Sequence, residues 1–259
     1  MANRILLWVM APGVLLGAVH CADHSFMSPD YGTDSARNTE DSNAETETTR
    51  DTETTDLDSQ ADSETHEEIP PRFDVAETLS KPADFKQSDG VDGLVVIEAE
   101  DFTLQVEATD GSAWKEVTVP DNYSGTGAMQ ATPPEYEEHK PQNNAQSNAP
   151  MLVYTVEFVK ADPVYVWARA SHADGFTDSV WFGKNGVIEG TSPLSFFDDE
   201  HEVLNDWLYI HLLMDGGEAV LDIPKVGLYT FDLYMREPSF VIDKIVLTTN
   251  SNFDPQSAN

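Results

Sequence analysis

Apolar and polar residues alternate with a period of two along the C-terminal part of the chain, from Leu94 onward. Side chains alternate between the two faces of a β-strand, so this period is typical of strands that bury one face. Six short runs show it, and Gly, Pro or Asp punctuate them: 152–158, 164–170, 178–182, 219–223, 228–234 and 240–247. Runs of this length and spacing predict an all-β sandwich or barrel for residues 94–255.

The chain before Leu94 has too few large apolar residues to form a core. Between Tyr31 and Phe73 there is no aromatic residue, and Leu57 and Ile69 are the only large aliphatic ones. Residues 23–68 contain 15 acidic and 2 basic side chains among many Ser and Thr. Because like charges repel and little apolar surface can be buried, we expect a disordered acidic linker over residues 23–93. It would act as a tether for the folded domain or as a solubilising spacer.

The first 22 residues resemble an export signal. An apolar run from Ile5 to Val19 follows Arg4 and is interrupted by Pro12 and Gly13, so it is shorter than the ~20 residues of a membrane span. Cys21, the only cysteine, comes directly after this run, as the acylated cysteine does in bacterial lipoproteins. His20 stands where that pattern has a small residue, which leaves ordinary signal cleavage as the alternative. We therefore expect an exported protein, attached to a membrane by a lipid on Cys21 or secreted.

Charge and motifs exclude several functions. The chain has 14 Lys and Arg against 47 Asp and Glu, a formal net charge of −33, which would repel nucleic acid. The sequence contains no Gly-x-Ser-x-Gly elbow, Walker loop or HExxH motif, so we expect no enzyme activity. We also expect a monomer.

Three carboxylates lie in unusual places for a simple sandwich. Glu98 and Glu100 are two residues apart in the first predicted strand and point to one face, where they would repel each other without a cation. Asp243 shares its side of the last strand with apolar residues, and burying an unpaired carboxylate is costly. If these two strands are neighbours, the three acids converge into a set of oxygen ligands that suits Ca²⁺. The alternative is that the two glutamates face solvent while Asp243 pairs with Arg236 or Arg169.

Four motifs, in this order, resemble the galactose-binding-like carbohydrate-binding modules of families 6 and 35 (CBM6 and CBM35), which are fused to glycoside hydrolases. The motifs are VVIEAEDF at 95–102, NYSGTGAM at 122–129, the pair VYVWARA and DSVWF at 164–170 and 178–182, and MREPSFVIDKIVLTTNSNFDP at 235–255. The resemblance implies a jelly-roll β-sandwich with a structural Ca²⁺ that joins its first and last strands. It assigns the metal to Glu98, Glu100 and Asp243.

The same resemblance implies a polysaccharide or glycan as the partner, bound by aromatic side chains on loops, because the C–H face of a sugar stacks on a flat ring. Tyr123 and Trp207 are the two candidate platforms; Tyr123 could instead pack on its own loop, and Trp207 could lie in a core strand. Phe196 and Phe197 are alternatives, and His201 with His211 near the acidic turn 198–202 could form a second metal site.

Some residues depart from the family pattern. Val241 stands two residues before Asp243, where many sugar-binding members have a polar residue, and an insertion at 133–150 could reshape or cover a cleft. The sequence therefore favours non-catalytic carbohydrate binding. The alternative is a structural or protein-interaction domain of the cell envelope that kept the sandwich and lost the sugar site.

The lipid anchor can be tested by replacing Cys21 with Ser. If Cys21 carries a lipid, C21S should move the protein from the membrane to the soluble fraction of fractionated cells, because the acyl chains supply the membrane affinity. Unchanged membrane association of C21S would contradict the anchor.

Overall fold

The computed structural model describes residues 69–132, 142–173, 177–196 and 206–256. All of them belong to the second of two compact units, residues 63–259. The predicted signal at 1–22 and most of the predicted linker lie outside the described residues. No helix in the described part of the chain is long and apolar enough to cross a membrane.

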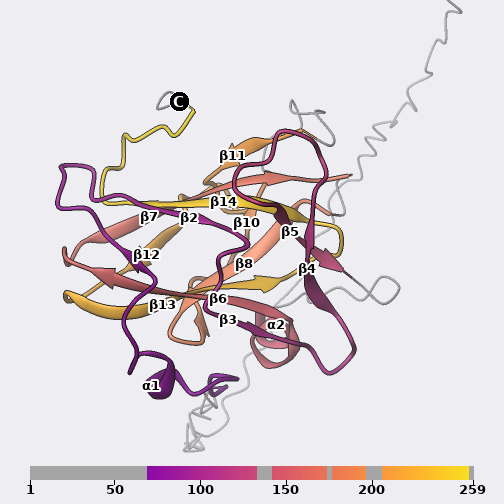
Figure 1. The fold of residues 1–259 in the computed structure, drawn as a ribbon, viewed down its shortest axis with the longest axis horizontal. Helices are drawn as coiled ribbons and strands as arrows, with labels where there is room; N and C mark the ends of the chain where they lie inside the picture. The colour runs from indigo at the N-terminus through magenta and orange to yellow at the C-terminus, as the bar shows by residue number, and fades with distance from the viewer. Residues whose placement is uncertain (1–68, 133–141, 174–176, 197–205, 257–259) are drawn as a thin grey trace, which may run out of the picture. The chain divides into compact units, whose positions relative to one another are not determined.

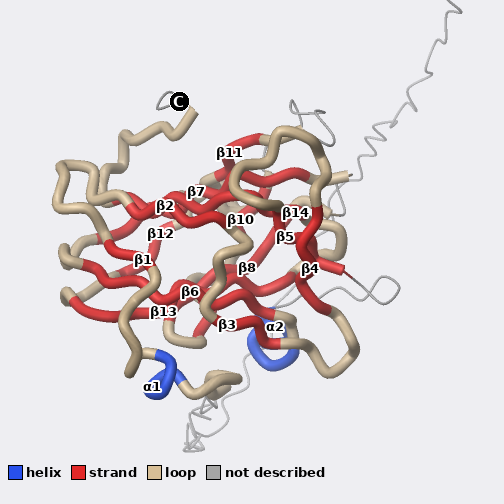
Figure 2. Tube along the Cα trace, viewed as in Figure 1, coloured by secondary structure: helices blue, strands red, loops and turns tan. Residues whose placement is uncertain are grey.

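Two β-sheets face each other as two layers (Figures 1 and 2). Sheet A has the strand order β1-β6-β13-β8-β10, with β3 beside β6 and β9 beside β8. Its strands are β1 (Phe85–Lys86), β3 (Leu104–Val106), β6 (Met151–Phe158), β8 (Ser179–Lys184), β9 (Val187–Ile188), β10 (Leu194–Ser195) and β13 (Gly227–Met235). Sheet B has the order β11-β7-β14-β5-β4, with β12 beside β7 and β2 beside β14. Its strands are β2 (Val95–Glu98), β4 (Ala113–Val117), β5 (Ala128–Thr132), β7 (Pro163–Ser171), β11 (Leu208–Ile210), β12 (Val220–Asp222) and β14 (Val241–Thr248).

The predicted all-β sandwich is confirmed, and each of the six apolar runs overlaps a strand. In sheet A, Phe231 of β13 lies directly opposite Tyr154 of β6, and their ring centroids are 6.2 Å apart. The Tyr154 hydroxyl donates a hydrogen bond of 2.8 Å to the carbonyl oxygen of Ala99, which follows β2 of the other sheet. These rings therefore mark the face of sheet A that packs against sheet B.

Ordered structure begins earlier than the predicted boundary at Leu94. Helix α1 (Val75–Thr78) is capped by the Asp74 side chain, and β1 pairs in parallel with β6. The Gln87 side chain, 1% exposed, accepts hydrogen bonds from the backbone N–H groups of Val159 and Lys160. Residues 69–93 thus belong to the sandwich, because a few apolar and amide side chains are enough to add an edge strand.

A short helix, α2 (Gln142–Asn148), lies at the outer side of sheet A and packs against β13 and β9 (Figure 1). It comes from the second half of the insertion at 133–150, whose first part, 133–141, lies outside the described residues. Strand β13 is buried on both faces over Tyr229–Met235, whereas a strand with one solvent face would alternate.

The first and last strands of sheet B are neighbours. Strand β2 pairs antiparallel with β14, with Glu98 opposite Lys244 and Val95 opposite Leu247. The pairing of β14 with β7 on its other side shifts register between Ile242 and Lys244, so Asp243 lies at an irregularity of the ladder. This irregularity turns the Asp243 carboxylate toward the loop between β4 and β5.

Candidate functional site

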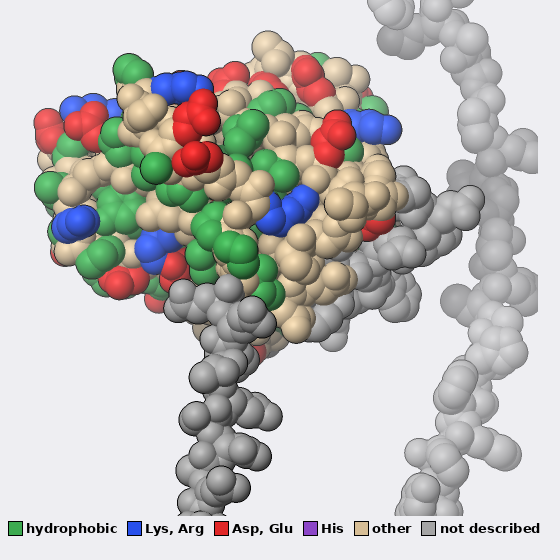
Figure 3. Space-filling view, turned by 90° about the horizontal axis from the view of Figure 1, so that it is seen from below, with side chains coloured by type: hydrophobic (Ala, Val, Ile, Leu, Met, Phe, Trp, Pro, Cys, Tyr) green, Lys and Arg blue, Asp and Glu red, His purple; other side chains and the backbone are tan. Residues whose placement is uncertain are grey.

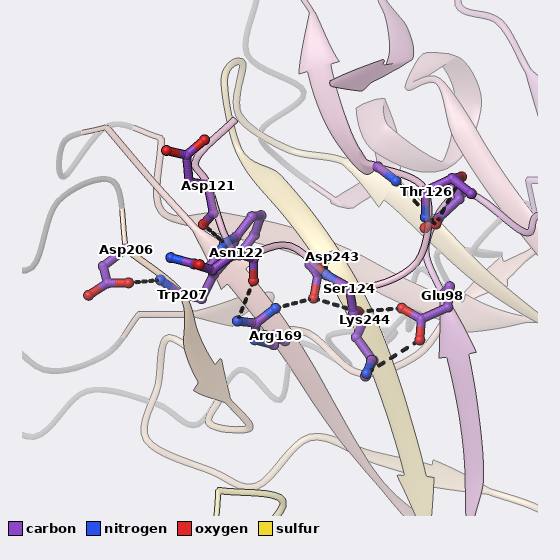
Figure 4. Close-up of polar contacts among 12 residues, drawn as sticks. Glu98, Asp121, Asn122, Ser124, Thr126, Arg169, Asp206, Trp207, Asp243 and Lys244 are labelled. Carbon is purple, nitrogen blue, oxygen red and sulfur yellow. Dashed lines mark hydrogen bonds and ion pairs between the residues drawn. The ribbon is translucent and has the colours of Figure 1, made fainter. Parts of the chain in front are cut away.

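The loop between β4 and β5 brings backbone and side-chain donors to the junction of the first and last strands. Asp243 is fully buried, and its carboxylate accepts hydrogen bonds from the Ser124 backbone N–H at 2.6 Å and the Ser124 hydroxyl at 3.0 Å. One terminal nitrogen of Arg169, on β7, donates a hydrogen bond of 2.5 Å to the same carboxylate. Its other terminal nitrogen donates a hydrogen bond of 3.0 Å to the Asn122 carbonyl oxygen (Figure 4). The buried charge of Asp243 is therefore paired and hydrogen-bonded.

Glu98, at the end of β2, shares the Ser124 hydroxyl with Asp243. Its Oε2 is 2.5 Å from Ser124 Oγ, and its Oε1 is 3.3 Å from Lys244 Nζ (Figure 4). A serine hydroxyl carries a single hydrogen, so it can donate fully to only one of the two carboxylates. The hydroxyl alone cannot satisfy both carboxylates, and Arg169 and Lys244 supply the positive charge beside Asp243 and Glu98.

Glu100 caps the same loop from the other side. Its Oε1 accepts hydrogen bonds from the backbone N–H groups of Thr126 at 2.6 Å and Gly127 at 3.3 Å. Gly125 adopts a left-handed φ of 63°, and a Cβ there would lie 2.1 Å from Glu100 Oε1, so only glycine fits. The other oxygen, Oε2, is buried without a hydrogen-bond partner.

These contacts show which of the arrangements expected for the three acids is present. Asp243 does pair with Arg169, whereas Arg236 pairs with Glu237 at 2.6 Å. Glu98 and Glu100 are partly buried rather than turned to solvent. Within the described ranges no group of three or more His, Cys, Asp or Glu side chains is close enough to hold a metal ion. The three acids all contact the loop between β4 and β5. Arg169 pairs with Asp243, and Lys244 pairs with Glu98.

The aromatic candidates belong to a small apolar cluster beside this junction. Trp207 and Tyr123 pack with Ala128 and Val241, and Trp207 is 9% exposed. The Trp207 indole N–H donates to the Asp121 carbonyl oxygen at 2.9 Å, and the Arg169 guanidinium lies 5.1 Å from the ring centroid. A sugar platform needs an open ring face, and Trp207 is packed here.

A cavity of about 200 Å³ lies at the same end of sheet B, where β5, β7 and β14 meet the loop before Tyr123. Its lining combines apolar and hydrogen-bonding side chains: Val119, Pro120, Gln130, Ser171, His172, Ala173, Ser239 and Val241. Sequence reasoning named only Val241 of this set. The others come from separate segments, 119–130, 171–173 and Ser239, so only the strand order shows that they meet.

The remaining sequence candidates lie elsewhere. Phe196 packs against the core, with its ring centroid 4.3 Å from that of His172 and 6.2 Å from that of Phe240. His211 stacks on Trp167 with centroids 3.9 Å apart, and burial lowers the pKa of its imidazole. Phe197, His201 and the acidic turn 198–202 lie outside the described residues.

The chain is similar in fold to solved carbohydrate-binding modules. A family 35 module from Clostridium thermocellum is 13% identical, with 60% of this chain and 96% of that chain covered and a TM-score of 0.40. A GH26-CBM35 β-(1,4)-mannanase from Podospora anserina is 16% identical, with 62% and 29% covered and a TM-score of 0.38. The C-terminal CBM6 of a laminarinase, LamC, from Zobellia galactanivorans is 15% identical, with 60% and 98% covered and a TM-score of 0.36. These neighbours include CBM35 and CBM6 domains, and the likeness is one of general architecture.

One curated relative is an uncharacterized protein, P23, from Formosa agariphila, which is 27% identical over 193 residues. The match covers 63% of this chain and 46% of the relative, so the chain spans about half the length of that protein. No family model matches the chain.

The ion pair at the junction makes a stability prediction. Replacing Arg169 with Met should lower the free energy of unfolding by about 3 kcal/mol, because the buried Asp243 charge loses its partner. Urea denaturation measures the loss, and adding Asp243→Asn to the variant should recover part of it. Lys86→Met, which breaks an exposed pair with Glu157, is the matched control and should cost less than about 1 kcal/mol. Equal losses for the two single variants would contradict a special role for Arg169.

Proposed function

We propose that this chain is a non-catalytic carbohydrate-binding protein that holds a polysaccharide or glycan at the end of sheet B. The observation that carries the proposal is the cavity of about 200 Å³ where β5, β7 and β14 meet. Small-molecule sites are concave and mostly apolar, with a few polar groups that fix orientation, and this lining has that composition. The sequence resemblance to families 6 and 35 supports the same class of ligand.

The lining offers both kinds of contact that a sugar needs. Gln130 and Ser171 carry an amide and a hydroxyl that can exchange hydrogen bonds with sugar hydroxyls. Val119, Pro120 and Val241 supply apolar surface for the C–H groups of a pyranose ring. Recognition here would depend on shape and neutral hydrogen bonds.

We propose that Tyr123 and Trp207 form the apolar packing next to the cavity. Val241 belongs both to the cavity lining and to their apolar cluster, so the cluster and the cavity share a wall. Tyr123 is partly exposed and remains the proposed aromatic contact with the ligand. Trp207 would fix the position of Val241 in the cavity lining, because its indole is hydrogen-bonded and its ring lies beside Arg169.

A second candidate function is a structural or protein-interaction domain that lost the sugar site. Two observations favour it: Trp207 is packed rather than presented, and apolar Val241 stands where a polar residue would meet a sugar hydroxyl. Pull-down from envelope extracts would then recover a specific protein, whereas glycans would have no effect on the capture.

Affinity electrophoresis across a panel of neutral and acidic polysaccharides tests the first proposal. The full chain should be retarded by at least one polysaccharide, and Gln130→Ala should weaken the binding about fivefold to tenfold, since a lost hydrogen bond costs about 1 kcal/mol. Leu228→Ser, at an exposed side chain outside the cavity lining, is the control and should bind as the parent does. Failure of every polysaccharide to retard the protein would remove the proposal and leave the second candidate.

We also propose that Glu98, Glu100 and Asp243, which are not close enough to form a metal site as they stand, draw together around a structural Ca²⁺ between the first and last strands. The buried, unpartnered Oε2 of Glu100 is the observation that supports it, because a carboxylate oxygen without donors suits a hard cation. When bound, the ion would tie the strand junction to the loop.

Calcium removal tests this site by thermal unfolding. EDTA should lower the melting temperature and added Ca²⁺ should restore it, because an ion that binds only the folded state stabilises by about 2.7 kcal/mol at 100 times its dissociation constant. Glu100→Gln should abolish the response, whereas Glu157→Gln, an exposed carboxylate, should keep it. A melting temperature that neither EDTA nor Ca²⁺ changes would contradict the site.

Export and tethering complete the proposal. The signal-like residues 1–22 and the acidic linker would place the sandwich outside the cytoplasm, free or held by a lipid on Cys21.

A further inference from the structure

The outer face of sheet A, turned away from sheet B, carries an unusual set of buried polar side chains. Phe231 points into the core with Tyr154, so Thr230, Asp232 and Tyr234 of β13 point to the opposite face. Trp181 of β8 lies directly opposite Tyr234 in the ladder and shares this face.

Two segments cover this face, and side-chain hydrogen bonds to the backbone hold them. The Gln146 side chain of α2 donates a hydrogen bond of 2.5 Å to the Gly186 carbonyl oxygen and accepts one of 2.7 Å from the Ile188 backbone N–H. These two hydrogen bonds join α2 to the turn between β8 and β9. Arg72 donates to the carbonyl oxygens of Ala149, at the end of α2, and Glu107. We call α2 and residues 69–73 the cover. Figure 3 views the molecule from the side of α1 and α2 and shows hydrophobic side chains gathered near the middle of this face.

Beneath the cover the polar groups lack partners. Asp232 is fully buried; its Oδ2 accepts a hydrogen bond of 2.6 Å from the Gly186 backbone N–H, and its Oδ1 has no partner. The Trp181 indole N–H is also buried without a hydrogen bond, and the buried Tyr234 hydroxyl has only the Gln146 side chain beside it. A charged carboxylate in this place would be poorly solvated, so the covered face accepts Asp232 best when it is neutral.

Several charged and titratable groups lie on or beside this face. Tyr234 and Arg72 are next to Asp232, and Asp110 lies near Arg72. The Asp84 carboxylate accepts a hydrogen bond of 2.9 Å from Thr155, which is opposite Thr230 in the ladder. The neighbouring strands and α2 contribute the neutral residues Val153, Gly183, Trp181 and Gln146. Burial raises the pKa of Asp232 to about 7, although the Gly186 N–H and the Thr230 hydroxyl oppose the rise. Burial also raises the pKa of Tyr234, which therefore stays neutral over the same range.

We propose that Asp232 is a proton-operated latch for the cover. Neutral Asp232 lets α2 and the Arg72 segment stay docked on sheet A, and ionised Asp232 favours their release, because water then reaches the carboxylate. Release would expose the Trp181 and Tyr234 rings to solvent. It would also detach residues 69–73, which follow the predicted acidic linker, from sheet A.

The direction of the pH effect follows from proton binding. In the open state the carboxyl is hydrated and titrates near its ordinary pKa of about 3.9, so the docked state binds the proton more tightly. Docking therefore weakens as pH rises from about 4 to about 7, by about tenfold in the equilibrium constant for each pH unit, and changes little above that range.

Amide hydrogen exchange read by NMR on the full chain tests the latch. The Ile188 N–H, held by Gln146, reports the docking of α2 directly. After correction for intrinsic exchange rates, its protection factor should fall about tenfold from pH 5 to 6 and about fivefold from pH 6 to 7, then level off by pH 8. Asp232→Asn, which cannot ionise, should show a protection factor that does not change with pH.

Asp222→Asn, at an exposed carboxylate on β12 of the other sheet, is the matched control and should keep the wild-type profile. A wild-type Ile188 protection factor that stays constant from pH 5 to 8 would overturn the proposal, as would an equal fall in the Asp232→Asn variant. The wild-type profile decides alone if Asp232→Asn does not fold.

Discussion

The buried carboxylate of Asp243 is the constraint around which one end of the sandwich is arranged. Asp243 lies in β14, the strand that pairs with β2, β5 and β7, so a charge at this position affects four strands at once. Arg169 and the Ser124 backbone N–H satisfy it, and both contacts fix the loop between β4 and β5. The same loop carries Tyr123 and borders the cavity, so the electrostatics of the junction determine the shape of the proposed ligand site.

The outer face of sheet A also buries an aspartate, Asp232, but in different surroundings. The Asp243 carboxylate is paired with the Arg169 guanidinium and accepts from a backbone N–H, whereas Asp232 has one backbone donor and an oxygen without a partner. The two buried aspartates thus have different surroundings, because a cation lies 2.5 Å from one, and burial raises the pKa of the other to about 7. The first fixes the site rigidly, and the second leaves the cover responsive.

Much of the fold could be predicted from the sequence because alternation is a local property. The run at 164–170 lies within β7 and the run at 228–234 within β13. The residues alone left the pairing of the first and last strands as a condition, and only the family resemblance implied it. The cavity could not be predicted, since Gln130, Ser171 and Ser239 meet only through strand order. Sequence also gave no sign that Trp207 packs beside Arg169, because a packed and a presented Trp follow the same local pattern.

The position of β14 in the middle of sheet B has a consequence for how the chain assembles. During synthesis, β2, β5 and β7 emerge long before the strand that joins them, so their edges stay open until residues 241–248 have been made. Open edges invite pairing with other chains, and closing these long-range contacts is slow. A chain that stays unfolded until residues 241–248 have been made would avoid this hazard.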